Sequence, residues 1–180
     1  NVMQRMSAIA TLTNKYVKAL EGLNTKVLDT RKTTPLIRFL EKEAVKIGGG
    51  VNHRYGLYDM IMLKDNHNDF AGGIENSINK TIQYLTDNNL NLKIEVETRN
   101  IEEVKEVLKV GNIDRIMLDN FNYEDMRKAV KLINNQYETE ASGGINLETV
   151  RKYAECGVDF VSVGALTHSV SNMDLSLKAI

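Results

Sequence analysis

One unit recurs along this chain: a short apolar segment, a polar or glycine-bearing turn, and an amphipathic helical pattern. The apolar segments are continuous rather than alternating, which is typical of parallel strands covered by helices on both faces of the sheet. Successive segments begin about 20 to 35 residues apart, the spacing of strand–helix units. We therefore predict strands at Lys26–Leu28, Asp59–Leu63, Lys93–Val96, Arg115–Leu118, Tyr137–Thr139 and Asp159–Val163.

Helical patterns lie before the first strand and between the later ones. Val2, Met6, Ile9, Tyr16 and Leu20 share one stripe, which predicts an N-terminal helix. This pattern starts without a cap, so we expect the chain to be a fragment of a longer protein. The other predicted faces are Leu36, Ile37, Leu40, Ala44 and Ile47, with Arg38, Glu41, Lys42 and Lys46 opposite them; Ile101, Val104 and Leu108; Met126, Ala129, Val130 and Ile133; and Leu147, Val150 and Ala154, in a helix from Asn146 to Gly157.

Six such units fit either an open doubly wound sheet or an incomplete barrel. An open sheet gathers its binding residues at one switch point, whereas a barrel uses the carboxyl ends of its strands. Here every predicted strand has a polar or glycine residue at or after its carboxyl end. At 180 residues, the chain is shorter than the roughly 250 residues of a full eight-stranded barrel. We predict an α/β fold: an incomplete, about six-stranded parallel α/β barrel, TIM-like, with an N-terminal helix.

Composition excludes several functional classes. Lysine and arginine total 23 against 24 acidic residues, so bulk charge does not favour a nucleic-acid partner. No apolar run approaches the roughly 20 residues needed to cross a membrane, so we expect no membrane partner. The lone cysteine, Cys156, cannot form an internal disulfide, and we interpret it as a buried structural thiol. This cysteine usage favours a cytoplasmic location.

Five cationic side chains follow the first two strands. Arg31 and Lys32 come after the first strand, Lys64 ends the second, and His53 and Arg54 follow a glycine run between them. Gathered at one barrel mouth, they would bind a ligand with several negative charges, because arginine matches carboxylate or phosphate geometry and lysine acts as a point charge. Singly, the arginines and Lys32 are also compatible with ordinary surface charges. Lys64 could instead be a Schiff-base lysine, although its cationic neighbours favour anion binding.

Two carboxylates end the next two strands. Glu97 follows Val96, and Asp119 follows Leu118. Facing a cationic anion site, they would hold Mg²⁺ or accept hydrogen bonds from sugar hydroxyls, and two carboxylates are enough for Mg²⁺ when the substrate supplies further oxygens. Each could equally cap the helix that follows it.

Glycines follow the last two strands. Ser142, Gly143 and Gly144 precede the predicted helix at Asn146, so their N–H groups can point at a phosphate at the positive end of that helix. Gly164 ends the next strand and forms the adjacent wall. Most such tripeptides are turns, but barrels often bind phosphate at their last two units.

The remaining candidates are interpreted as structural. We expect His53, beside cationic Arg54, to stay near neutral or to hydrogen-bond a ligand rather than carry a proton. His67 and His168 show no zinc-site spacing and are more typical of structural histidines. The first glycine of Gly48–Gly50 is expected to end the preceding helix in a left-handed conformation.

Several segments occur in a recognisable order over nearly all 180 residues. They are Asp29–Pro35, Gly48–Leu57, Lys64–His67, Glu95–Glu97, Leu118–Asn120, Glu140–Gly143 and Gly164–Ser169. Together they resemble the quinolinate phosphoribosyltransferase family, whose other name is nicotinate-nucleotide pyrophosphorylase (carboxylating). The resemblance implies that residues 1–180 are the barrel domain, without the N-terminal α/β domain of the family. That domain would supply one more substrate-binding arginine, across a homodimer or higher homo-oligomer.

The resemblance also implies a reaction in NAD biosynthesis. Quinolinate and phosphoribosyl pyrophosphate would give nicotinate mononucleotide, pyrophosphate and carbon dioxide, with Mg²⁺ as cofactor. The catalytic residues would be Lys64, Glu97 and Asp119. By matching positions, Arg31, His53, Arg54 and Lys64 would surround quinolinate; Lys32, Glu97, Asp119, Ser142, Gly143, Gly144 and Gly164 would contact the phosphoribosyl donor; and Glu97 and Asp119 would hold Mg²⁺.

Three alternatives remain open. A member of the same family could act on another heteroaromatic carboxylate, although so many cations favour a dicarboxylate, because a monocarboxylate would leave buried positive charge unpaired. A barrel could bind a phosphorylated ligand without turnover. An aldolase acting through Lys64 is a different enzyme class, and borohydride trapping would reveal it.

Overall fold

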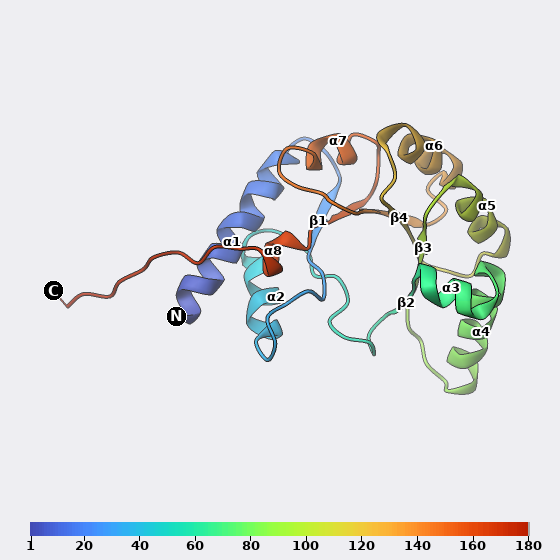
Figure 1. Ribbon diagram of the computed structural model, residues 1–180, viewed down its shortest axis with the longest axis horizontal. Coiled ribbons are helices and arrows are strands. Elements are labelled where there is room, and N and C mark those ends of the chain that lie inside the picture. Colours follow the sequence, from blue (N-terminus) through green and yellow to red (C-terminus); the bar gives the residue numbers. More distant parts are fainter. Residues whose placement is uncertain (180) are drawn as a thin grey trace.

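The computed structural model describes residues 1–179. Within them, six parallel strands form one curved sheet in the order β1-β6-β5-β4-β3-β2 (Figure 1). Their bounds are β1 (Lys26–Leu28), β2 (Ile61–Leu63), β3 (Ile94–Thr98), β4 (Arg115–Asp119), β5 (Glu138–Ser142) and β6 (Phe160–Ser162).

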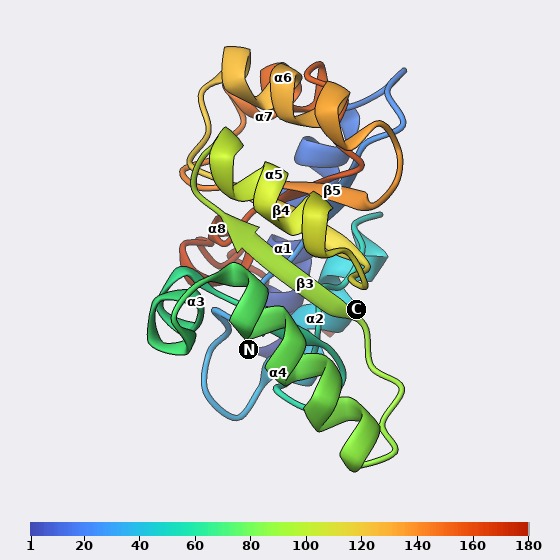
Figure 2. The ribbon, with the colours of Figure 1, turned by 90° about the vertical axis from the view of Figure 1, so that its right-hand side faces the viewer.

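Helices cover the outer side of the sheet, and Figure 2 shows α4 and α5 on either side of the β3 arrow. Asparagine side chains fix two of the helix starts: Asn100 accepts the N–H of Glu103, and Asn122 accepts the N–H of Asp125. The helices are α1 (Val2–Ala19), α2 (Arg38–Ile47), α3 (Asp65–Ala71), α4 (Ile74–Asp87), α5 (Ile101–Val110), α6 (Tyr123–Ile133), α7 (Val150–Ala154) and α8 (Ala165–His168).

The barrel is open between β1 and β2, which are the two edges of the sheet. Beyond the edge of β1, Val51 makes an isolated parallel bridge with Leu28. The N–H of Val51 donates to the carbonyl of Val27 at 2.8 Å, which anchors the segment before His53 beside this strand. The predicted fold class is therefore confirmed: the chain forms an incomplete six-stranded parallel barrel with an N-terminal helix.

The core lies between the strands and the helices outside them. Val96, Ile116 and Val161 on the strands are fully buried, as are Met126 and Ala129 on the inward face of α6. Burying a large apolar side chain contributes about 1.5–3 kcal/mol, so this layer fixes the curvature that brings the strand ends together.

Three strands run past their predicted ends, and a carboxylate lies in each extension. β5 was expected to stop at Thr139, yet it runs through Glu140 to Ser142, and Glu140 is fully buried. β3 likewise continues past Val96 through Glu97, which is also buried, to Thr98, and β4 includes Asp119. A carboxylate can occupy a buried strand position when cations neutralise it.

The predicted apolar face of α2 is only partly correct: Ala44 is buried and Lys46 is exposed as expected, but four other positions differ. Leu36 and Ile47 are 96 % and 66 % exposed, whereas Glu41 and Lys42, expected on the solvent side, are buried. The buried charges are paired: Lys42 Nζ donates to Asp29 at 2.5 Å, and Glu41 accepts from Arg5 at 2.9 Å.

The turn after α2 also differs from the prediction. Gly48 is right-handed with φ −72°, and Gly49 takes the left-handed conformation with φ +91°. Gly48 is required for another reason, because a Cβ there would overlap the carbonyl oxygen of Ala10 on α1. Close helix packing thus explains the first glycine.

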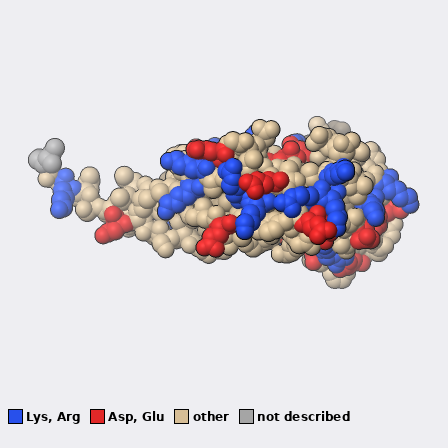
Figure 3. Space-filling model, turned by 90° about the horizontal axis from the view of Figure 1, so that it is seen from above, with Lys and Arg blue, Asp and Glu red and all other residues tan. Residues whose placement is uncertain are grey.

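The outer surface carries charges of both signs. Figure 3 shows Lys and Arg interleaved with Asp and Glu over the visible face, without a field of one sign. Among residues 1–179, no helix combines the length and apolar character needed to cross a bilayer.

Candidate active site

A pocket of about 890 Å³ opens at the carboxyl ends of the strands. This volume lies within the range of small-molecule sites. Every residue that the sequence predicts for the site lines this pocket: Arg31, Lys32, His53, Arg54, Lys64, Glu97, Asp119, Ser142, Gly143, Gly144 and Gly164. The structure therefore brings the whole predicted set together, while the role of each residue stays a prediction.

Two arginines form the cationic side of the pocket. The guanidinium of Arg54 donates to the carbonyl of Met60 at 3.2 Å. Burial, and then the positive charge of Arg31, lower the pKa of Arg54. Among residues 1–179, the buried Nε of Arg31 has no hydrogen-bond partner. An anion between the two guanidinium groups would relieve both their repulsion and this unsatisfied donor.

His53 lies at the floor of the pocket and is 8 % exposed. Its Nε2 is 3.0 Å from Glu95 Oε2 and 3.2 Å from Glu140 Oε2. Burial alone would lower the pKa of the imidazole, but the two carboxylates together raise it to about 9. This direction opposes the expectation that His53 stays near neutral, which considers Arg54 and not the carboxylates brought from distant strands. The Nδ1 atom accepts the N–H of Arg54 at 2.6 Å, as the ring nitrogen of a neutral imidazole does.

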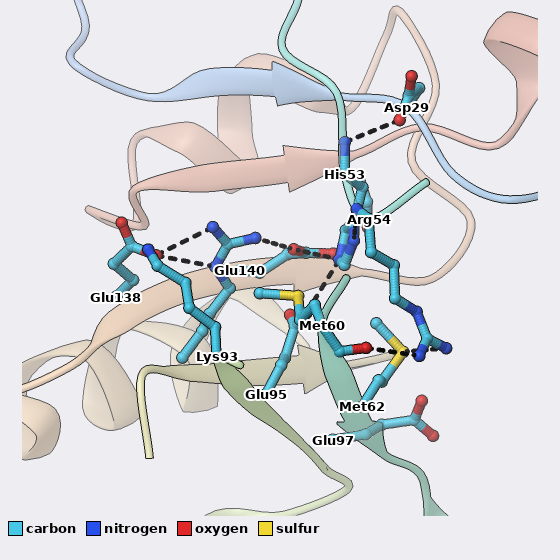
Figure 4. A network of polar contacts seen from close by, with 12 residues as sticks. Asp29, His53, Arg54, Met60, Met62, Lys93, Glu95, Glu97, Glu138 and Glu140 are labelled. Atoms are coloured by element: carbon cyan, nitrogen blue, oxygen red, sulfur yellow. Dashed lines mark hydrogen bonds and ion pairs between the residues drawn. The ribbon is translucent and has the colours of Figure 1, made fainter. Parts of the chain in front are cut away.

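Those carboxylates belong to a buried ion-pair network beneath the pocket (Figure 4). Arg115 donates to Glu140 Oε2 at 3.1 Å and to Glu138 Oε2 at 2.9 Å. Sequence reasoning did not assign Glu95, Glu140 or Arg115 to the site. One signal could have found them: each is a charged residue within a strand that is otherwise buried.

A second support holds the backbone of His53. Asp29 accepts the N–H of His53 at 2.8 Å and the side chain of Asn52 at 2.5 Å. Lys42 joins the other side, donating to Asp29 and, at 3.0 Å, to the carbonyl of His53. Burial raises the pKa of Asp29 and lowers that of Lys42, and each partner opposes the shift of the other. This pair connects β1 and α2 to the floor of the pocket.

The acidic side of the pocket contains Glu97 and Asp119. Burial raises the pKa of Glu97, the ammonium of Lys64 opposes this, and the charge of Asp119 adds to it. Lys64 Nζ lies 3.9 Å from Glu97 Oε2. Asn100 caps α5 and Asn122 caps α6, so neither Glu97 nor Asp119 caps the helix that follows it. The capping alternative is wrong.

The glycine loop adopts a conformation that other residues rarely reach. Gly143 and Gly144 have φ of +100° and +59°, and a Cβ on Gly143 would overlap the amide of Asn120. The predicted helix after this loop starts later than Asn146, because α7 begins at Val150. A phosphate here would therefore meet the loop backbone rather than the end of a long helix.

The wall beside this loop contains Lys32, Gly164 and His168. Thr167 Oγ1 donates to the carbonyl of Lys32 at 2.7 Å, which ties the loop after β1 to α8. His168 was interpreted as structural, yet it lines the pocket and is exposed. His67 does have a structural contact, since its Nδ1 accepts the N–H of Lys64 at 3.1 Å at the start of α3. Cys156 is buried, as expected.

Curated proteins similar to this chain carry consistent names. The chain is 50% identical over 192 aligned residues to "Nicotinate-nucleotide pyrophosphorylase [carboxylating], chloroplastic" of Arabidopsis thaliana, covering 99% of the chain and 55% of the relative. It is 45% identical to "Probable nicotinate-nucleotide pyrophosphorylase [carboxylating]" of Bacillus subtilis, covering 98% and 60%. The chain thus spans somewhat more than half the length of these relatives.

Solved structures agree with this similarity. The NadC structure from Streptococcus pyogenes superposes with a TM-score of 0.92 at 41% identity, covering 99% of this chain and 61% of that one. The nicotinate-nucleotide pyrophosphorylase from Francisella tularensis superposes with a TM-score of 0.90 at 42% identity, covering 96% and 60%. Residues 9–178 match the family described as quinolinate phosphoribosyl transferase, C-terminal domain. With the pocket at its strand ends and these relatives along almost its full length, the chain belongs to the quinolinate phosphoribosyltransferase family, in the part that forms the C-terminal domain.

Proposed function

We propose that this chain forms the barrel of an enzyme that joins quinolinate to phosphoribosyl pyrophosphate and removes one carboxylate, giving nicotinate mononucleotide, pyrophosphate and carbon dioxide. One observation carries the proposal: a single pocket places Arg31 and Arg54 on a cationic side and Glu97 and Asp119 on an acidic side. Such a pocket suits an anionic acceptor next to a sugar that becomes electron-poor.

The cationic side would orient the acceptor. Two guanidinium groups match two carboxylates, and His53 in its charged form adds a third cation at the floor. Held in this way, the pyridine nitrogen can face the ribose carbon from which pyrophosphate departs. A dicarboxylate suits this set better than a monocarboxylate, which would leave one buried charge without a partner.

The acidic side would stabilise the transfer. As the bond to pyrophosphate breaks, positive charge develops on the ribosyl group, and Glu97 and Asp119 lie where they can face it. The new carbon–nitrogen bond makes the ring nitrogen positive. The carboxylate beside it then leaves as carbon dioxide, its bonding electron pair stays on the ring carbon next to that nitrogen, and a proton takes its place.

Magnesium fits the same carboxylates. Mg²⁺ prefers oxygen ligands and usually takes one or two carboxylates together with substrate phosphate oxygens. Glu97 and Asp119 lie close enough for their charges to repel, and a cation between them would relieve this repulsion. When bound, Mg²⁺ would neutralise charge on the departing pyrophosphate.

The phosphate end of the donor would lie in the glycine loop. Gly143 and Gly144 leave room for close approach to the backbone, and Lys32 and Gly164 face the same pocket.

Lys64 is half exposed and 3.9 Å from Glu97, whereas a Schiff-base lysine is desolvated or lies beside another cation. This placement gives the aldolase alternative no support.

A homo-oligomer is part of the proposal. Large apolar side chains lie exposed around the start of α2 and the loop before β2, near the open side of the barrel. They are Leu36, Phe39, Leu57 and Tyr58. Sedimentation velocity should show a dimer or larger species, and a monomer at all concentrations would refute this part.

The ligand class is tested by calorimetric titration of the chain with quinolinate, nicotinate and phthalate, each in the presence and absence of Mg²⁺ and phosphoribosyl pyrophosphate. The proposal predicts that the two dicarboxylates bind and that nicotinate binds at least about tenfold more weakly. Preference for nicotinate would point to another member of the family. Binding of phosphoribosyl pyrophosphate with none of the acids would point to a barrel that only binds phosphate.

A further inference from the structure

Arg38 is the first residue of α2, and its guanidinium joins two segments beside the pocket. Its Nε donates to Thr33 Oγ1 and its Nη1 to the carbonyl of Tyr55, both at 3.0 Å. Its Nη2 donates to the carbonyl of Arg31 at 3.4 Å. Arg31 and Thr33 belong to the loop after β1, whereas Tyr55 belongs to the segment that leads to β2. We call this side chain, with its three acceptors, the Arg38 bridge.

The two bridged segments carry the arginines of the cationic side. Arg31 accepts from Arg38 through its own carbonyl, and Arg54 directly precedes Tyr55. Arg31 and Arg54 both line the pocket, and their like charges repel each other. The distance between their guanidinium groups therefore depends on how the two segments are held.

The sheet does not hold this distance. Within residues 1–179, β1 and β2 are the two edges of the sheet and no ladder joins them. The segment from residue 52 to residue 60 runs across the open side of the barrel (Figure 1). Asp59 accepts the N–H groups of Tyr55 and Gly56 at 2.6 and 2.8 Å, which closes a turn in this segment. The Arg38 bridge ties that turn to the loop after β1.

Other contacts keep the loop after β1 folded. Glu41 accepts the N–H of Thr34 at 2.9 Å and its hydroxyl at 2.8 Å. Thr167 Oγ1 donates to the carbonyl of Lys32 at 2.7 Å. Loss of the Arg38 bridge should therefore loosen the two segments relative to each other without unfolding the loop.

The position of Arg38 is otherwise unfavourable. The N-terminus of a helix carries partial positive charge, which favours acidic rather than basic side chains there. In the described part of the chain, the guanidinium donates to one hydroxyl and two carbonyls, so its hydrogen bonds bring no carboxylate to balance its charge. Arg38 is not among the residues that line the pocket, so it does not bind a ligand there directly. Its contacts support the joining of two segments.

We propose that Arg38 is a positioning residue that sets the spacing between Arg31 and Arg54 and so selects acceptors whose two carboxylates lie on neighbouring ring atoms. Two guanidinium groups at a fixed separation match one separation of carboxylates, because each pair forms in a definite geometry. Such a site loses discrimination when its supporting contacts loosen. The inference rests on the proposed function for the chemical class of the acceptor, whereas the Arg38 bridge can be tested without a ligand.

Amide hydrogen exchange of the chain without ligand tests the Arg38 bridge. Arg38→Lys keeps the charge but not the planar fork that reaches several acceptors. In this variant, residues 30–34 and 53–57 should both exchange about 3- to 10-fold faster than in the unmodified chain, and exchange in β4 should be unchanged. Unaltered exchange in the two segments would overturn the proposal.

Lys46→Met is the matched control. Lys46 lies on the same helix, but it is half exposed and pairs with Glu43 of α2 rather than with either segment. Exchange of residues 30–34 and 53–57 should therefore match the unmodified chain. Equal acceleration in both variants would show a general loosening of α2 and refute the specific role of Arg38.

Calorimetry with two isomeric dicarboxylates tests the selectivity. Phthalate has its carboxylates on neighbouring ring carbons, and isophthalate has one carbon between them. The unmodified chain should bind phthalate at least about 10-fold more tightly than isophthalate, and Arg38→Lys should reduce this preference to about 3-fold or less.

Phosphoribosyl pyrophosphate is the reference ligand for the same variant. Its affinity should change by less than about 2-fold, because Lys32 is held by Thr167 and the glycine loop follows β5, away from the Arg38 bridge. An equal loss of affinity for all three ligands would show a merely structural role and refute the proposal.

The remaining outcomes are also decisive. If Arg38→Lys does not fold, Thr33→Val supplies the same test, because it removes the acceptor of Nε and leaves the guanidinium in place; smaller changes in the same direction would support the proposal, and no change would overturn it. If the unmodified chain binds neither dicarboxylate, while exchange responds to Arg38→Lys and not to Lys46→Met, the proposed function fails and the Arg38 bridge stands. If the unmodified chain binds isophthalate as tightly as phthalate, Arg38 does not set selectivity and the proposal is wrong.

Discussion

Replacing Lys42 by methionine removes one charge from the support beneath the pocket, and with it the hydrogen bond from Nζ to the carbonyl of His53. Methionine preserves most of the length and apolar volume of the side chain. Lys42 is 1% exposed and Asp29 is fully buried, with Nζ and Oδ1 2.5 Å apart. After the change, Asp29 retains the N–H of His53 and the amide of Asn52 but has no cation beside it.

The magnitude follows from this burial. Removing one partner of a buried ion pair typically costs about 3–5 kcal/mol, because the remaining charge is left uncompensated. We therefore expect the free energy of unfolding, measured by urea titration at pH 8, to fall by about 3–5 kcal/mol. That is a large part of the roughly 5–15 kcal/mol available to a domain.

The same helix supplies a control. Lys46 pairs with Glu43 at 2.5 Å, but both side chains are about half exposed. Lys46→Met should therefore cost less than about 1 kcal/mol. The two variants remove the same charge four positions apart, so the difference between them isolates the effect of burial.

Repeating the urea titrations at lower pH tests whether the uncompensated charge of Asp29 causes the loss of stability. Burial raises the pKa of Asp29 above its ordinary 3.8, and loss of Lys42 should raise it further. As pH falls through this raised value, Asp29 takes up a proton and its uncompensated charge disappears. The deficit of Lys42→Met should thus be larger at pH 8 than at pH 5. A deficit below about 1 kcal/mol, equal to that of Lys46→Met at both pH values, would refute the reasoning.

The remaining predictions concern the pocket and His53. Arg54→Ala should weaken quinolinate binding by about 2–5 kcal/mol in calorimetry, and unchanged affinity would mean that the anion site is misassigned. Gly143→Ala should abolish phosphate-dependent binding while the fold survives by circular dichroism, because a Cβ there overlaps Asn120 and φ is +100°; retained affinity would contradict a close backbone approach. The pKa of His53 is raised from 6.5 to about 9 on folding, so its contribution to stability is complete below pH 6.5 and is lost as pH rises through 9. Urea titrations should show this decline, His53→Gln should flatten it, and identical profiles would contradict the shift.

The strand ends could be predicted because polar residues interrupt apolar runs. Asp119 at the end of β4 and Lys64 after β2 stand next to continuous apolar residues, so their position at the carboxyl edge follows from the sequence pattern alone. The resemblance to a family then added expected roles. The pocket that gathers these residues is what a barrel geometry requires.

Buried charges could not be predicted in this way. Lys42 and Glu140 look like surface residues in a hydrophobicity pattern, since the pattern assumes that a charge stays in water. Their partners lie far along the chain: Asp29 is 13 residues from Lys42, and Arg115 is 25 residues from Glu140. Only the fold brings them together, and this also explains why the sequence pattern does not reveal the carboxylates beside His53.

Product formation tests the central claim most directly. The chain, alone and joined to the N-terminal region of a full-length relative, should be incubated with quinolinate, phosphoribosyl pyrophosphate and Mg²⁺, and nicotinate mononucleotide measured by chromatography. Glu97→Gln and Arg54→Ala in the longer protein serve as controls for each side of the pocket. The account predicts nicotinate mononucleotide and an equal amount of carbon dioxide from the longer protein, and strongly reduced product from both variants. A folded longer protein that binds both substrates and forms no product would contradict it.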